Sequence, residues 1–195
     1  MDEYIALDIQ RLWYMDVLTV PPTSQNIGEL TQNAVEIENV HEDTWTLEEE
    51  EAEQNVFVNQ LTGGAYRMEN RAMGNIVINF TIGEYDFATK TALMGGSNTE
   101  TSWERQLGVV ELRKCIIAYT EDNLFCVIPC ANIIARESET DDAIGIAVQA
   151  IALPNDNPLV KPEYWMIFDE QRGAWMWDDG TIIDWDNGKR ISLEY

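Results

Sequence analysis

Residues 75–103, NIVINFTIGEYDFATKTALMGGSNTETSW, contain the signals of a strand, a short helix and a polar loop in direct succession. Apolar residues take every second position at the start, which predicts a β-strand with one buried face: Ile76, Ile78, Phe80 and Ile82. One short α-helix is expected over about residues 84–94, and Gly95 and Gly96 end it because glycine tolerates left-handed backbone conformations. A polar loop then leads to Trp103. Since this helix interrupts a chain with β patterning elsewhere, we expect a mostly-β fold.

The segments on both sides of this stretch have the alternation and the turn residues of β-strands and hairpins. Residues 55–68 form a predicted hairpin around Thr62-Gly63-Gly64, and residues 109–128 form another around a turn at 121–123. Further strands are expected over residues 4–20, 33–41, 44–49 and 143–153.

Three connecting segments are expected to be irregular. Residues 21–28 begin with two prolines and predict an exposed loop. Pro129 predicts a strand end or an edge position, because proline cannot donate to a neighbouring strand. Residues 137–142 predict an acidic loop.

The C-terminal part of the chain differs in composition from the rest. We divide the sequence into a β domain over residues 1–158 and a tryptophan-rich extension over residues 159–195. Short apolar pieces alternate there with Asp-Gly and Asn-Gly turns, which predicts a C-terminal β-meander. Its candidate aromatic surface consists of Trp165, Trp175, Trp177 and Trp185.

The charge of the chain restricts its partners. The 195 residues include 35 acidic and 12 basic side chains, for a net charge of −23. Such a surface repels nucleic-acid phosphates and anionic lipids, which argues against tight binding of either and leaves room for DNA to slide past. We expect no membrane association, and the acidic N-terminus does not have the pattern of a signal peptide. Synthesis and retention in the host cytoplasm are therefore expected before any assembly.

We find no constellation of residues that predicts catalysis. His41 is the only histidine and lacks a nucleophile motif beside it. Cys115, Cys126 and Cys130 lie in apolar strand context and without zinc-ligand spacing, so buried thiols are expected. Residues 184–188 begin like a calcium loop, but a hairpin turn explains them better. The prediction is a protein that is not an enzyme and has no cofactor and no metal.

The order of these elements resembles the major tail tube proteins of long-tailed bacteriophages, a family that includes the tube protein of type VI secretion systems. The resemblance covers about residues 34–158. It lies in the strand VEIENVHEDTWTLEEEEAE, the hairpin around Thr62, the helix end ALMGG, the late hairpin ELRKCIIAYTEDNLFCVIPCANIIAR and the strand AIGIAVQAIALPNDNP.

This resemblance implies a β-sandwich or barrel-like fold with one flanking helix. It also implies a structural virion protein that forms hexameric rings, stacked into a tail tube with an acidic channel through which DNA passes. Its partners would be further copies of itself and other tail proteins, and its location the virion tail. The candidate self-association hairpin comprises Glu48, Glu49, Glu50, Glu51, Gln54, Val56, Gly63 and Gly64. The candidate helix-stop and loop residues are Gly95, Gly96 and Trp103.

Two alternatives stay open at the level of sequence. The chain could be another tail component, such as a terminator, a distal tail protein or a baseplate hub protein. It could instead be a soluble β-sandwich domain that binds a glycan or a peptide, with the C-terminal tryptophans as an aromatic platform.

Overall fold

A computed structural model describes residues 8–108, 110–140 and 143–167. The described chain is mostly β, as predicted, with two helices, α1 (Ile27–Asn33) and α2 (Phe87–Met94). Its strands are β1 (Ile9–Met15), β2 (Val35–Ile37), β3 (Thr46–Glu49), β4 (Glu53–Val58), β5 (Ala65–Ala72), β6 (Ile76–Ile82), β7 (Ser97–Asn98), β8 (Trp103–Glu104), β9 (Leu112–Thr120), β10 (Leu124–Thr140), β11 (Ala143–Ala152) and β12 (Tyr164–Ile167).

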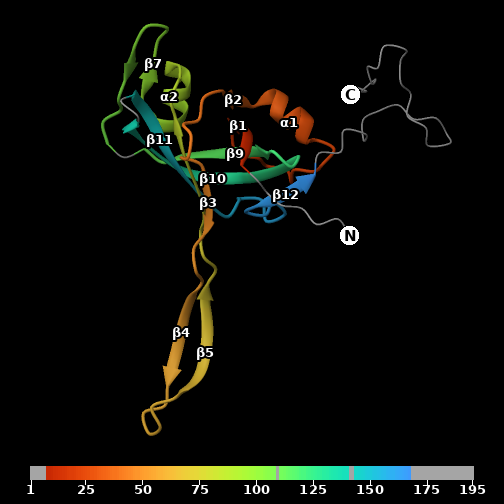
Figure 1. Cartoon of the computed structure of the whole chain (residues 1–195), viewed down its shortest axis with the longest axis vertical. Coiled ribbons are helices and arrows are strands. Elements are labelled where there is room, and N and C mark those ends of the chain that lie inside the picture. Colours follow the sequence, from red (N-terminus) through yellow and green to blue (C-terminus); the bar gives the residue numbers. More distant parts are fainter. Residues whose placement is uncertain (1–7, 109, 141–142, 168–195) are drawn as a thin grey trace, which may run out of the picture.

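The main sheet is antiparallel and curls until its two ends meet. Its strand order is β2-β1-β9-β10-β11-β6-β3, with β12 attached to β10. The segment after β2 reaches the opposite end of the sheet, where Val40 bridges Ile82 and the His41 amide donates to the Thr81 carbonyl over 2.9 Å. These contacts join the curled sheet across its two ends, where the resemblance implied either a sandwich or a barrel-like sheet. Figure 1 shows how the strands are arranged.

The larger core cluster lies inside this curl. The alternating residues of β6 point into it, since Ile78, Phe80 and Ile82 are buried there as predicted. Side chains from β1, β9, β10 and β11 complete the cluster, including Leu12, Ile116, Ile128, Ile146 and Val148. Since these residues come from strands far apart in sequence, the curl of the sheet is what assembles the core.

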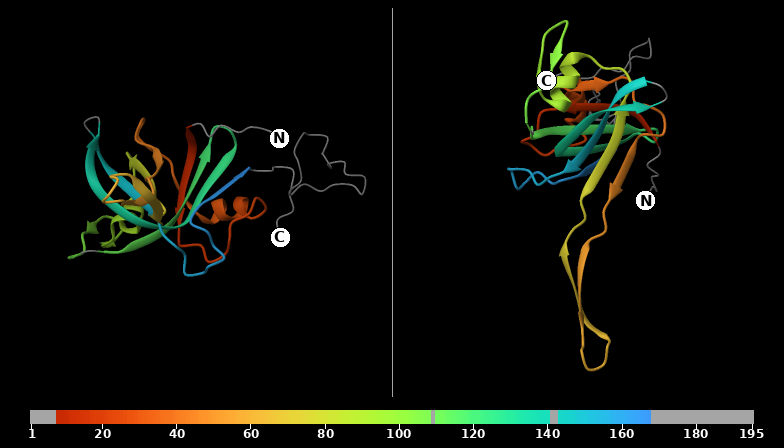
Figure 2. Two further views of the ribbon diagram at one scale, coloured as in Figure 1. Left: turned by 90° about the horizontal axis from the view of Figure 1, so that it is seen from below. Right: turned by 90° about the vertical axis from the view of Figure 1, so that its left-hand side faces the viewer.

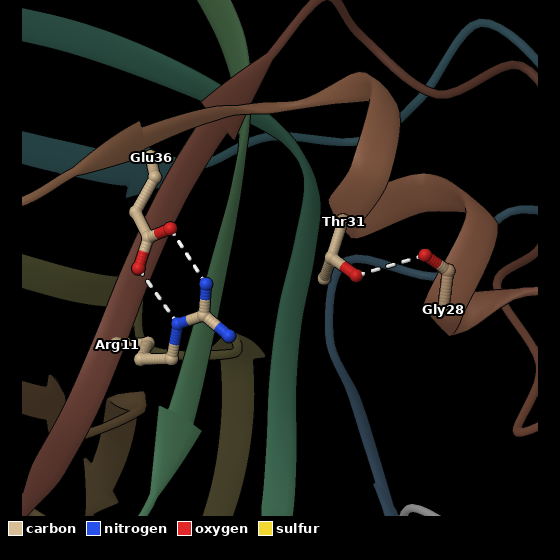
Figure 3. Close-up of polar contacts among 4 residues, drawn as sticks. All are labelled: Arg11, Gly28, Thr31 and Glu36. Carbon is tan, nitrogen blue, oxygen red and sulfur yellow. Dashed lines mark hydrogen bonds and ion pairs between the residues drawn. The ribbon is translucent and has the colours of Figure 1, made fainter.

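A smaller cluster lies on the outer face of the sheet and explains a helix that the sequence patterns did not predict. Ile27 of α1 is fully buried against Trp13, Ile117 and Phe125. The loop expected over residues 21–28 therefore ends earlier, because α1 begins at Ile27. Within α1 the Thr31 hydroxyl donates to the Gly28 carbonyl over 3.0 Å (Figure 3). With only seven residues, α1 carries too little periodicity to be recognised and is held by packing.

The short strand β2 is fastened to β1 by a two-pronged ion pair. The Arg11 guanidinium donates to both carboxylate oxygens of Glu36, over 2.7 and 2.6 Å (Figure 3). This contact is the largest cause that lowers the pKa of Glu36. Val35 at the start of β2 is half exposed, because β2 lies at the end of the sheet order.

Strand β10 is longer than the sequence predicted. It continues through Pro129, where a register shift against β9 between Ile128 and Ala131 accommodates the missing donor. Glu137 and Glu139, expected in an acidic loop, are paired in register with Ile146 and Ile144 of β11. The prediction of a loop over residues 137–140 is wrong because pairing with β11 outweighs the low strand propensity of glutamate.

The C-terminal prediction is covered only in part by the described residues. Strand β12 pairs with β10, with Trp165 opposite Cys126, so the chain beyond residue 158 adds a strand to the main sheet. The rest of the expected meander, with Trp175, Trp177 and Trp185, lies outside the described residues.

Candidate assembly interface

The predicted self-association hairpin forms a separate arm that projects from the body of the protein. We define the arm as residues 53–72, which comprise β4, β5 and their connecting turn. Within the described residues the two strands pair only with each other, from Glu53 opposite Ala72 to Val58 opposite Ala65. Figures 1 and 2 show the arm extending along the longest axis, well clear of the curled sheet. At about 3.3 Å per residue, the eight residues of β5 span about 26 Å.

A tight turn ends the arm. Gly63 has a positive φ of 69°, which favours glycine, and its amide donates to the Asn59 carbonyl over 2.8 Å. The Asn59 side-chain oxygen accepts a hydrogen bond from the Leu61 backbone amide over 2.8 Å. The backbone amide of Asn59 donates to the Gly64 carbonyl over 2.9 Å. The hairpin and its Thr62-Gly63-Gly64 turn are thus confirmed by the structure.

The arm joins the body through two three-residue connectors that lie against each other. Residues 50–52 link β3 to β4, and residues 73–75 link β5 back to β6. The Glu50 amide donates to the Asn75 carbonyl over 2.9 Å, and the Asn75 side-chain amide donates to the Glu50 carboxylate over 2.7 Å. These two hydrogen bonds hold the base of the arm to the end of the sheet.

Apolar side chains on the arm are exposed to an unusual extent. Their exposed fractions are 48% for Val56, 57% for Val58, 94% for Leu61, 67% for Tyr66 and 66% for Met68. The rings of Phe57 and Tyr66 lie 6.3 Å apart between centroids, and Phe57 is itself 37% exposed. Monomeric proteins rarely expose so many neighbouring apolar side chains, so this arm has the properties of a contact surface.

Charge is divided along the arm. Five carboxylates lie at or next to its base, on Glu48, Glu49, Glu50, Glu51 and Glu53. From Gln54 to Met68 the sequence contains no acidic residue, and Arg67 is its only charged residue. In a chain of net charge −23, a stretch of this length without a carboxylate removes repulsion at the tip while the base stays strongly acidic.

The candidate helix-stop and loop residues serve packing around α2. Gly95 has a φ of 75° and accepts a hydrogen bond from the Trp103 indole over 3.0 Å. A Cβ on Gly96 would fall 2.3 Å from the Glu104 carbonyl oxygen, so only glycine fits under this loop. The structure therefore brings Gly95, Gly96 and Trp103 together and assigns them to the connection between α2 and the β7–β8 hairpin.

A buried lysine completes this cluster and was not singled out by the sequence. The Lys90 ammonium donates to Glu137 over 2.6 Å and lies 4.4 Å from the centroid of the Trp103 ring. The Lys90 side chain is 11% exposed, whereas that of Glu137 is 43% exposed. The hydrogen bond from Lys90 is the main cause that lowers the pKa of Glu137. One ion pair thus ties α2 to the far half of β10.

The candidate aromatic surface is represented by one described residue. Trp165 on β12 is 44% exposed, and its indole donates to Glu163 over 2.8 Å. The three other tryptophans lie outside the described residues, so no aromatic platform is assembled in the described part.

The cysteines and the histidine considered in the sequence lie in packed parts of the structure. Cys115, Cys126 and Cys130 are buried free thiols, and burial raises the pKa of each. Among residues 8–108, 110–140 and 143–167, no three His, Cys, Asp or Glu side chains form a group that could hold a metal ion. His41 Nε2 is buried without a hydrogen-bond partner in the same part of the chain, against Gly83.

Comparison with known proteins adds no relative. No protein-family model matches the chain, and no curated protein sequence matches it either. No helix within the described ranges is long and apolar enough to cross a membrane. The fold and the site thus define a class, a curled β-sheet protein with a projecting apolar arm.

Proposed function

We propose that this protein is a structural subunit that self-assembles into stacked rings and forms the tail tube of a bacteriophage or prophage. The observation that carries the proposal is the arm, which exposes Val58, Leu61, Tyr66 and Met68 far from the body of the protein. Burying these side chains against further copies would stabilise an assembly by about 25 cal/mol for each Å² of apolar surface removed from water.

The attachment of the arm suits a role in assembly. Because β4 and β5 pair only with each other in the described chain, the arm contributes nothing to the curled core and can be devoted to contacts with another copy. A projecting hairpin that inserts into a neighbour forms a head-to-tail contact, and such contacts generate stacks when the symmetry does not close. Closed rings, hexameric by the resemblance stated above, would form through other surfaces of the same subunit.

The charge supports a channel that DNA can traverse. A subunit of net charge −23, repeated around a ring, surrounds the lumen with a potential that repels phosphate, so DNA would pass without adhering. The same charge opposes association of the subunits. An arm tip without carboxylates lowers that opposition where the contact is made.

The test is shortening of the arm. A variant in which residues 54–71 are deleted, with Glu53 joined to Ala72 through a Gly-Asn turn, should keep the curled sheet because those residues pair only among themselves. Wild-type protein at high concentration should form rings and tubes in negative-stain electron microscopy. The shortened variant should melt like the wild type and form no tubes.

A point variant and its control sharpen this test. Val56→Glu places a charge on the arm, at a side chain 48% exposed, and should block tubes; Val20→Glu places the same charge on the body, at a side chain 64% exposed, and should not. Wild-type protein that stays monomeric at every salt concentration, or tubes formed by the shortened variant, would overturn the proposal. Tryptophan fluorescence that responds to a glycan in such a monomer would favour the binding-domain alternative.

A further inference from the structure

The two ends of the molecule along its longest axis carry different surfaces. Figures 1 and 2 show the arm at one end and α2, with the edge strand β2 beside it, at the other. A stack built by repeating one head-to-tail contact joins the arm of each copy to a different surface of the next, and when the repeat runs along the longest axis this surface lies at the end opposite the arm. The surface that receives the arm is therefore to be sought near α2 and β2.

A groove of suitable shape lies at this end. It has a volume of about 410 Å³ and lies between β2 and the segment that leads from β6 into α2. Its lining includes Val35, Tyr85 and Thr89, and the floor is made by the buried core residues Ile37 and Ile82. Val35 is 48% exposed, which leaves an apolar side chain accessible beside the groove.

We propose that this groove binds the tip of the arm, residues 54–68, from the next copy of the same chain. The inference rests on the proposed function and specifies the surface that accepts the arm.

Charge complementarity is the first argument for this occupant. Glu38, Glu84 and Asp86 line the groove, are exposed, and give its rim a negative charge. A segment bearing carboxylates would be repelled there, whereas the tip of the arm carries none and has Arg67 as its only charge. The Arg67 side chain is 65% exposed and forms an ion pair with Glu69 of the same strand, so it would exchange this partner for a carboxylate of the rim on binding.

The unpaired edge of β2 is the second argument. Among the described strands β2 pairs with β1 alone and lies at the end of the main sheet. Such an edge presents backbone donors and acceptors to an incoming extended segment. The strands of the arm are extended segments with apolar side chains. One of them can therefore form backbone hydrogen bonds with β2 and bury its apolar side chains in the same contact.

Cross-linking between copies tests the contact directly. Leu61→Cys, in the turn of the arm, is mixed with Val35→Cys at the groove, and tubes are treated with a short bismaleimide. The native thiols of Cys115, Cys126 and Cys130 are at most 3% exposed, so the new thiols should react selectively. We expect a cross-linked dimer from this mixture. We expect no such dimer when the control variant Val20→Cys replaces Val35→Cys.

A charge variant gives a second, independent readout. Val35→Glu adds a carboxylate to the acidic rim and should abolish tubes, whereas Val20→Glu should leave them intact. Thermal melting of the Val35→Glu monomer should match that of the wild type, because the side chain is half exposed. If that variant instead unfolds, the cross-linking result alone decides.

The outcomes separate this inference from the proposed function. The groove assignment would be overturned, and stacking through the arm left intact, by one combination of results. In it, the shortened variant forms no tubes, the Val35→Glu variant forms them, and Val35→Cys gives no cross-link. Equal cross-linking through Val20→Cys would overturn it as well. Wild-type protein that forms no tubes would overturn both.

Discussion

Gly74 lies so close to the backbone of Glu50 that a Cβ on Gly74 would fall 1.5 Å from the Glu50 carbonyl oxygen. The two residues belong to the two connectors of the arm, and the hydrogen bond from the Glu50 amide to the Asn75 carbonyl lies beside this contact. The absence of a side chain at Gly74 is thus what lets the connectors meet, and the contact determines where the arm leaves the sheet.

Gly74→Ala should therefore disturb the base of the arm. We expect a loss of about 1–3 kcal/mol in the free energy of unfolding, the usual cost of forcing an extra carbon into a packed site, and poorer tube formation because the arm is redirected. Urea unfolding and electron microscopy measure the two effects. Gly64→Ala, where the nearest atom would be 3.9 Å from the added carbon, is the matched control for urea unfolding and should leave the free energy of unfolding close to that of the wild type. Equal effects of the two changes would contradict this prediction.

Glu137→Gln should destabilise the protein more than Glu139→Gln. The first change leaves the Lys90 ammonium, 11% exposed, without its carboxylate, whereas Glu139 is exposed on the same strand. We expect a loss of about 2 kcal/mol, below that for a fully buried pair, because Lys90 keeps its contact with Trp103. Urea unfolding of both variants checks this, and similar midpoints would show that the ion pair adds little.

The stability of the protein should fall in acid. The carboxyl groups of Glu137, Glu36, Asp16 and Asp86 all have pKa values lowered from their ordinary values, each through a hydrogen bond or a nearby cation. A lowered pKa in the folded state contributes stability above the pKa of the unfolded chain, and this contribution is lost as the pH falls through the folded value.

The loss should thus begin below about pH 4.5, the ordinary value for glutamate. Melting temperature measured across this range gives the profile. The profile of the Glu137→Gln variant should be shallower in acid, since one of the titrating groups is gone. A variant profile parallel to that of the wild type would argue against a role of this pair.

Assembly should depend on ionic strength through the base of the arm. Changing Glu48, Glu49, Glu50 and Glu51 to glutamine removes four carboxylates at or next to the base of the arm from every copy of the proposed stack. The variant should assemble at lower salt than the wild type, because less repulsion needs screening. Light scattering across a salt series measures this.

The control removes the same charge elsewhere. Four exposed acidic residues away from the arm base are changed to their amides: Glu104, Glu121, Glu139 and Asp156. Coincident salt curves for the two variants would show that only total charge matters and not its place at the base of the arm.

Local patterns in the sequence determined much of the secondary structure. The alternation in β6, the helix α2 with its glycine stop, and the hairpin around Thr62-Gly63-Gly64 are where they were predicted, because each depends on residues close together in the chain. The helix α1 and the continuation of β10 through residues 137–140 were not predicted. Both are stabilised by distant partners, Phe125 for α1 and β11 for the end of β10.

The composition of the arm was likewise determined by the sequence, whereas its exposure was decided by the fold. The acidic run at residues 48–53 and the stretch without acidic residues at 54–68 can be read directly from the sequence. The difference between these two stretches is the sequence signal for a contact surface. That Tyr66 and Met68 are exposed follows only from the curled sheet, which closes on itself through Val40 and Ile82 and leaves the arm no place in the core. The burial of Lys90 and its pairing with Glu137, 47 residues away, also depend on the fold. Neither can be seen in the local sequence, because both require distant segments to meet.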